Sequence, residues 1–89
     1  MHTIHKFQVP LVDIPVLFMP KGSNILSFQV QNNIPVIWAL VDDEAVMENK
    51  RFIMLGTGHP ASNVIDHLCK YIGTIQLDGL VWHLFHKNG

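Results

Sequence analysis

Charged residues are scarce in this chain, and their scarcity limits what the protein can do. Asp, Glu, Lys and Arg make up only 15% of its 89 residues, against about 25% in an average globular domain. With so few charges to cover the surface, we expect some apolar area to be buried against a second copy, and hence a homo-oligomer. The single arginine and the scattered lysines disfavour nucleic-acid binding, which needs clustered cations.

Other features are missing as well. The only cysteine, Cys69, excludes an internal disulfide. The first ten residues lack the basic and apolar segments of a signal peptide. The longest apolar run, Ile34 to Val41, is much shorter than the roughly 18–20 residues that span a bilayer. We therefore expect a single β-rich domain over residues 1–89, located in the cytoplasm, with no contact to a membrane.

The apolar residues recur with a period of two, the spacing of side chains on one face of a β-strand. In the clearest case Leu26, Phe28 and Val30 point to one face, and the polar residues between them point to the other. Residues 36–41 are apolar on both faces, which predicts a central strand covered on both sides. Further strands are predicted at residues 3–9, 16–19, 51–57, 71–77 and 80–87.

Asp78-Gly79 joins the last two of these runs and predicts a two-residue type I′ hairpin, which fixes the register. The expected core-face pairs are Leu77–Leu80, Ile75–Trp82 and Gly73–Leu84. On the opposite face we expect Gln76–Val81, Thr74–His83 and Ile72–Phe85. Gly73 has no side chain, so it is expected to make room for a large neighbour such as Trp82.

The connections complete the fold prediction. Asn32-Asn33 tolerates left-handed backbone geometry and predicts a tight turn. Residues 42–51 hold six charges and are expected to form a solvated loop, and Ser62 to Lys70 is expected to form a short helix. The predicted fold class is mainly β: a small antiparallel sandwich or partly closed barrel of six to seven short strands with at most one short helix.

No residue cluster predicts a catalytic or metal site, and no cofactor is expected. The six histidines lack the i, i+2 spacing that would place two ligands on one face of a strand. Cys69 with His67 or His59, and Thr57 with His83, could each pair a nucleophile with a base, but neither has a recognisable local context. Asp42 and Asp43 are adjacent, so on a strand they point to opposite faces.

The strongest candidate for a binding site is Gly56-Thr57-Gly58-His59-Pro60. Two glycines free the backbone for left-handed turns and expose amide donors that can hold an anion. The predicted binding residues are Arg51, Thr57, Gly58, His59 and His83. The competing interpretation is a turn that only ends a strand. Trp38 and Trp82 are flanked by aliphatic residues, which favours packing in a core or an interface over an aromatic platform.

Several segments keep their order along most of the chain: Met19 to Gly22 with Ile25 to Ser27, Trp38 to Asp42, Arg51 with Gly56 to Pro60, Tyr71 to Thr74 with Gln76, and Leu80 to His83. Together they resemble a family of small proteins encoded in bacteriophages and prophages, which carries only a domain-of-unknown-function label. The resemblance brings no reaction, cofactor or catalytic residue. Residues 61–70 fall outside it, so it implies no role for His67 or Cys69.

The resemblance implies a phage context and the cytoplasm of a host cell. Small phage accessory proteins often act by binding, including as inhibitors of host defence. The expected function is therefore a non-enzymatic, homo-oligomeric binding protein that interferes with a host process by binding a host protein or sequestering a small ligand. Two alternatives remain: a structural or accessory component of the virion, and a small hydrolase that uses a metal or the side chains His59, His83 and Cys69.

Overall fold

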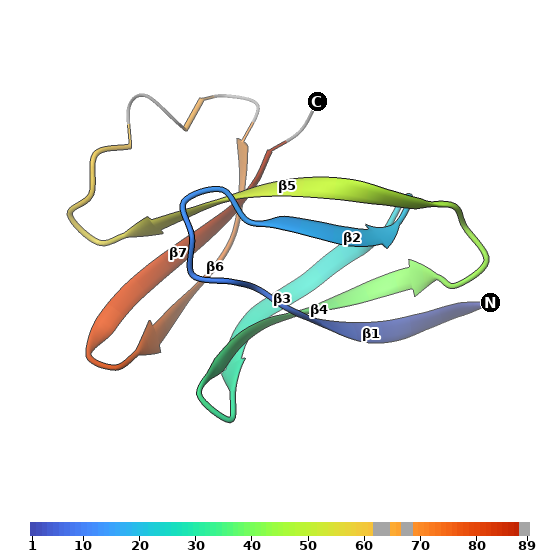
Figure 1. The fold of residues 1–89 in the computed structure, drawn as a ribbon, viewed down its shortest axis with the longest axis horizontal. Coiled ribbons are helices and arrows are strands. Elements are labelled where there is room, and N and C mark those ends of the chain that lie inside the picture. The colour runs from blue at the N-terminus through green and yellow to red at the C-terminus, as the bar shows by residue number, and fades with distance from the viewer. Residues whose placement is uncertain (62–64, 67–68, 88–89) are drawn as a thin grey trace.

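The computed structural model describes residues 1–61, 65–66 and 69–87, and all the secondary structure in these residues is β (Figure 1). Every strand pair is antiparallel. The strands are β1 (His2–Gln8), β2 (Val16–Pro20), β3 (Asn24–Gln31), β4 (Ile34–Asp42), β5 (Met47–Gly56), β6 (Cys69–Leu77) and β7 (Leu80–Lys87). In the described residues no helix is long and apolar enough to cross a membrane.

The strands form two sheets that pack as a sandwich. One sheet has the order β1-β4-β3 and the other has the order β2-β5-β7-β6. The sheets approach most closely where β3 lies beside β6. The chain crosses from one sheet to the other through residues 9–15, which run between the edge strands β1 and β2 (Figure 1). The prediction of a small antiparallel β-sandwich is confirmed, and it is a sandwich rather than a closed barrel.

The core is formed by the side chains that point inward at every second position of the strands. Ile37, Ala39 and Val41 of β4 have no exposed surface, and they face Phe52 and Leu84 of the second sheet, which are equally buried. Burying an aliphatic or aromatic side chain of this size contributes about 1.5–3 kcal/mol. Because residues two apart share a face, the odd residues of β5 and β7 point to the outer face of the second sheet.

Both predicted tight turns are present. Asp78 and Gly79 have φ of 53° and 78°, and the hairpin pairs Leu77 with Leu80, Ile75 with Trp82 and Thr74 with His83, as expected. Asn32 and Asn33 have φ of 52° and 64° and join β3 to β4 in the same way.

The hairpin differs from expectation farther from its turn. A bulge between Tyr71 and Gly73 shifts the register, so that Tyr71, not Ile72, lies opposite Phe85. Gly73 makes room for Phe28 of the other sheet rather than for Trp82. Beside the turn itself, Leu80 also differs from expectation. The sequence placed it on the core face, but it is 56% exposed because it lies at the tip of the hairpin.

Three further expectations were wrong in part. A second bulge, between Ile25 and Ser27, leaves Leu26 outside the core and 48% exposed. The charged loop is shorter than residues 42–51, because β5 already begins at Met47. The strand β4 is central, but its outer face is covered only in part, since Val36 is 1% exposed whereas Leu40 is 37% exposed.

The expected helix over residues 62–70 lies partly outside the described residues, at 62–64 and 67–68. Its last two residues, Cys69 and Lys70, are not helical but begin β6, where they pair with β7.

Candidate functional site

The glycine-rich segment forms a tight turn at the end of β5. The His59 amide donates to the Gly56 carbonyl at 3.0 Å, which places Thr57 and Gly58 in the middle of the turn. Gly58 has φ of 89°, the left-handed value that a type II turn requires at this position. The Thr57 amide donates to Val81 of β7 at 3.1 Å and so ties the turn to the neighbouring strand.

The His59 imidazole folds back over Gly56. The Gly56 amide donates to Nδ1 at 3.2 Å, and the ring meets Trp82 edge-on at 6.2 Å between centroids. A Cβ on residue 56 would lie 2.8 Å from the imidazole Cε1, so only glycine allows this approach. Because Nδ1 accepts a hydrogen bond, the neutral ring carries its proton on Nε2, which is left to donate.

A row of hydroxyl and imidazole groups continues from the turn across the outer face of the second sheet. The Thr57 hydroxyl contacts Nε2 of His83 at 2.7 Å, and the Thr74 hydroxyl contacts Nδ1 of the same ring at 2.9 Å. The Tyr71 hydroxyl bonds to the Thr74 hydroxyl. The hairpin register places Thr74 opposite His83, and the bulge brings Tyr71 to the same face.

Two cavities flank His59. One, of about 280 Å³, is lined by Gly56, Thr57, His59 and residues 79–82. The other, of about 330 Å³, is lined by Asp13, Ile14, His59, Pro60 and residues 53–55. The residues of each cavity that come from β5 and β7 are mainly apolar, whereas Asp13, Thr57 and His59 supply polar groups. This combination is typical of small binding sites.

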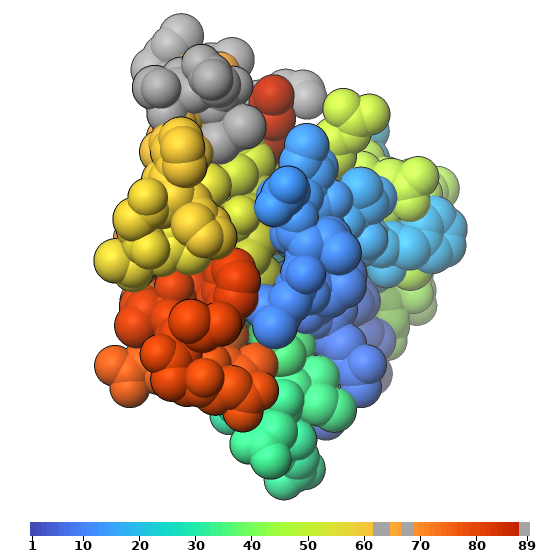
Figure 2. Space-filling view, turned by 60° about the vertical axis from the view of Figure 1, so that its left-hand side comes forward, coloured from blue at the N-terminus to red at the C-terminus, as the bar shows by residue number. Residues whose placement is uncertain are grey.

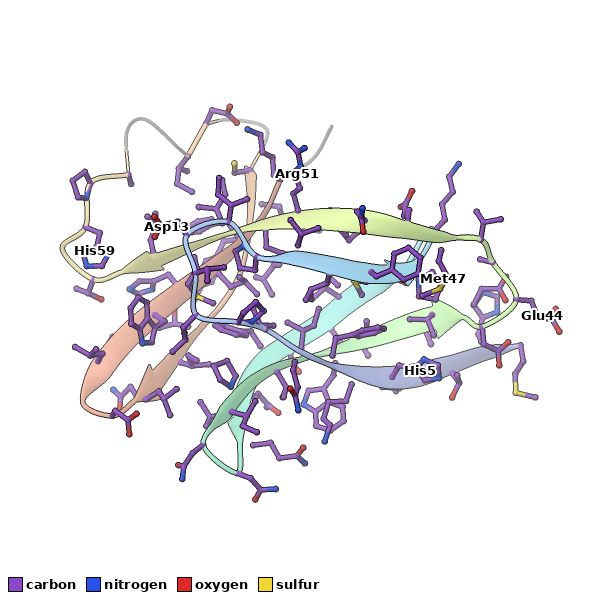
Figure 3. All side chains as sticks on the ribbon, in the orientation of Figure 1. His5, Asp13, Glu44, Met47, Arg51 and His59 are labelled. Atoms are coloured by element: carbon purple, nitrogen blue, oxygen red, sulfur yellow. The ribbon has the colours of Figure 1, made fainter. Side chains whose placement is uncertain are left out.

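The structure brings together four of the five predicted binding residues and leaves out the fifth. Thr57, Gly58 and His59 form the turn, and His83 joins it through Thr57. Arg51 is exposed on β5 and pairs with Val16, whereas Leu55 is the residue of β5 opposite His83. Four strand positions separate Arg51 from Leu55, about 13 Å. Figure 3 shows Arg51 well away from His59.

Sequence reasoning did not select Asp13, Tyr71 or Thr74. Thr74 could have been found, because the register of the Asp78-Gly79 hairpin already placed it opposite His83, whereas Tyr71 reaches this face only through the bulge. Asp13 gave no such signal, since it reaches the turn only through the pairing of its segment with β5. There the Met54 amide donates to the Asp13 carbonyl at 2.9 Å.

The other side chains considered from the sequence lie elsewhere. The Cys69 thiol is 3.7 Å from a carboxylate oxygen of Asp66, while His67 lies outside the described residues. A hydrogen bond from the Glu44 amide lowers the pKa of Asp42, and the N-terminal ammonium 3.5 Å away acts in the same direction. Within residues 1–61, 65–66 and 69–87, no three His, Cys, Asp or Glu side chains are grouped so that they could hold a metal ion.

The two tryptophans have different surroundings. Trp82 packs against the hydrophobic core and supports the His59 ring. Trp38 lies half-buried on the outer face of β4 and donates its indole N–H to Gln29 at 3.1 Å.

Comparison with known proteins gives a family but no function. A family model described as a domain of unknown function (DUF7352) matches residues 1–89. Neither the curated proteins nor the solved structures contain a match to the chain.

Proposed function

Because the chain belongs to the DUF7352 family, whose description names no activity, we propose a function from its own surface. The protein is a non-enzymatic binding protein of phage origin that acts as a homo-oligomer in the cytoplasm of a host cell. It interferes with a host process, such as antiviral defence, by holding a host protein or a small ligand at the turn of residues 56–60.

One observation carries the proposal: His59 stands between two cavities and is held there by its neighbours. The Gly56 amide and the Trp82 ring fix the orientation of the imidazole. A ligand therefore meets a donor that is already in place, which lowers the entropy cost of binding. The nearby Thr57 hydroxyl is held in the same way by His83.

The outer face of the β1-β4-β3 sheet supports self-association. Ile4 and Leu40 are cross-strand neighbours that are 56% and 37% exposed, and Trp38 lies beside them opposite Lys6. Leu26 adds a further apolar side chain that is 48% exposed. An apolar sheet face of this kind is buried when two copies pack face to face. This surface is separate from the turn, so self-association leaves the cavities accessible.

The test is recovery of a ligand that depends on the turn. Tagged wild-type protein and a His59→Ala, Thr57→Val variant are purified from phage-infected bacteria. Native mass spectrometry then measures the bound protein or small molecule and the oligomer mass. We expect a ligand on the wild type that the variant lacks, with both proteins in the same oligomeric state. Equal ligand content in the two proteins, or recovery of the protein only within purified virions, contradicts the proposal.

The contact between Thr57 and His83 favours a hydrolase as the second candidate. A hydroxyl 2.7 Å from an imidazole is the arrangement that activates a nucleophile, and Thr74 would orient the ring through Nδ1. Incubation with an activated acyl ester followed by mass spectrometry separates the two functions. Acylation of Thr57 in the wild type and its loss in His83→Gln supports the hydrolase, whereas an unmodified protein eliminates it.

A further inference from the structure

The end of the sandwich that carries the turn is hollowed by three adjoining cavities. The third, of about 530 Å³, is lined by residues 8–11, residues 33–35, Leu77 and Asp78. It meets the 280 Å³ cavity at the hairpin turn, where Asp78 lines one and Gly79 the other. That cavity in turn shares His59 with the 330 Å³ cavity. We call the combined lining the end surface. Figure 2 shows this end of the molecule. Residues 9–16 run down the middle of the view in blue, and the orange hairpin lies to their left.

The end surface exposes large apolar side chains from several parts of the chain. Leu11 is 44% exposed, Ile14 54%, Ile34 40% and Leu80 56%. They belong to three different walls: the segment that links the sheets, the start of β4 and the start of β7. Exposed apolar residues gathered around cavities mark an interaction surface, whereas isolated ones are ordinary.

The charge of the end surface has one sign. Asp13 and Asp78 are the charged residues that line the three cavities, and no described lysine or arginine lines any of them. The Nδ1 atom of His59 already accepts the Gly56 amide, so this side chain presents its Nε2 to a ligand. A ligand that complements these two carboxylates and the exposed apolar side chains carries a positive charge beside apolar groups.

We propose that the end surface binds a protein segment that carries apolar side chains and at least one lysine or arginine. This inference rests on the proposed binding function and names its partner class. A nucleic acid would bring phosphates against Asp13 and Asp78. A second copy packed on the same surface would add its own Asp13 and Asp78 to the interface without a lysine or arginine from the lining to pair with them, which costs free energy. The partner is therefore a different polypeptide.

The experiment selects peptides from a yeast-displayed random library on the immobilised wild-type protein. We expect the selected peptides to be enriched in lysine or arginine together with leucine or aromatic residues. The affinity of one selected peptide is then measured by fluorescence anisotropy. Asp13→Asn and Asp78→Asn should each weaken binding roughly two- to five-fold, as expected for exposed charge pairs. Leu80→Ser should weaken it about ten-fold, because it removes an exposed apolar anchor from the end surface.

The variants are chosen to leave the fold intact. Asn is as acceptable as Asp in the left-handed position of residue 78, and Asp13 holds its pairing with β5 through its backbone carbonyl. Glu44→Gln is the matched control, because it removes one negative charge from the loop between β4 and β5, at the opposite end (Figure 3). It should leave the affinity unchanged.

Selection of acidic or uncharged peptides overturns the inference, and so does a library that yields no binder. Equal effects of Asp78→Asn and Glu44→Gln also overturn it. None of these results removes the proposed function, which fails if the protein from infected cells carries no ligand that depends on the turn or is recovered only within purified virions.

Discussion

Gly73 of β6 lies against Phe28 of β3, at the place where the two sheets approach each other most closely. A Cβ built on residue 73 would be 3.1 Å from the Phe28 Cβ. Phe28 is 5% exposed and its Cβ is fixed to the backbone of β3, so it has little freedom to move aside. The absence of a side chain at residue 73 thus allows the two sheets to meet here.

We therefore predict that Gly73→Ala destabilises the protein. Alanine would reduce the entropy of the unfolded chain, which favours folding by about 0.4–1 kcal/mol. Overpacking a core costs about 1–3 kcal/mol, which outweighs that gain. Urea denaturation should show a net loss of about 1 kcal/mol. Because Phe28→Ala retains the Cβ, it should not relieve the Gly73→Ala penalty. A more stable Gly73→Ala protein would show that the sheets can separate without cost.

The partner of Gly73 also shows which parts of the fold can be read from the sequence. The hairpin at Asp78-Gly79 was predictable because a two-residue turn dictates the pairs beside it, as far as Gly73 and Leu84. Farther along, the bulge at Tyr71 adds a residue that no composition rule announces, and it exchanges Ile72 for Tyr71 opposite Phe85. The contact with Phe28 depends on how two sheets stack, which local pattern does not encode.

The candidate site divides in the same way. The turn of residues 56–60 was recognised because glycines mark left-handed geometry. The pair of Thr57 and His83 was one of several nucleophile–base pairs that the sequence allowed, and only the packing of the turn against β7 selects it. Arg51 was expected as a neighbour because it is close in sequence, but an extended strand carries it away from the turn. Asp13 joins the site through strand pairing alone.

The turn between β3 and β4 offers a test of backbone strain. Asn32 and Asn33 both have positive φ, which costs less for Asn than for most residues and least for Gly. Asn33→Gly creates the Asn-Gly pair favoured in type I′ hairpins, so we expect stability to rise by a few tenths of a kcal/mol. Asn33→Val should lower it by about 1–2 kcal/mol, since a β-branched residue resists this geometry. Thermal unfolding of the wild type and the two variants should rank Asn33→Gly as the most stable protein and Asn33→Val as the least stable.

The pKa of His86 predicts how stability depends on pH. Burial beside Phe52 lowers this pKa below its ordinary value of about 6.5, and Lys50 and Lys70 lower it further. The folded protein thus binds fewer protons than the unfolded chain in this range. The contribution of neutral His86 to stability is complete above pH 6.5 and is lost as the pH falls toward the folded-state pKa.

Urea denaturation between pH 8 and pH 5 should therefore show decreasing stability, and His86→Gln should reduce the slope. His5→Gln on the exposed part of β1 is the control and should keep the wild-type slope. The slope, not the absolute stability, is the measurement, because His86→Gln also changes packing against Phe52. Equal slopes for His86→Gln and the wild type would contradict the assignment.

The hydrogen bond from the Gly56 amide to His59 can be observed directly through the tautomer of the imidazole. Because the Gly56 amide donates to Nδ1, the neutral imidazole should carry its proton on Nε2. Long-range ¹H–¹⁵N correlation spectra distinguish the two tautomers and should show this form in the wild type at pH 8. The methyl carbon of Gly56→Ala would lie only 2.8 Å from Cε1 of the His59 ring, so the ring must move away.

The variant should then show a tautomer mixture and lose the ring-current effect of Trp82 on the His59 protons. Gly58→Ala is the matched control: it meets no atom within 4 Å, so it strains the turn only through its φ of 89°. It should keep the Nε2–H form while lowering stability by about 1 kcal/mol. If Gly56→Ala keeps a single tautomer, the imidazole is oriented by something other than this amide, and the ready-made donor on which the binding proposal depends is absent.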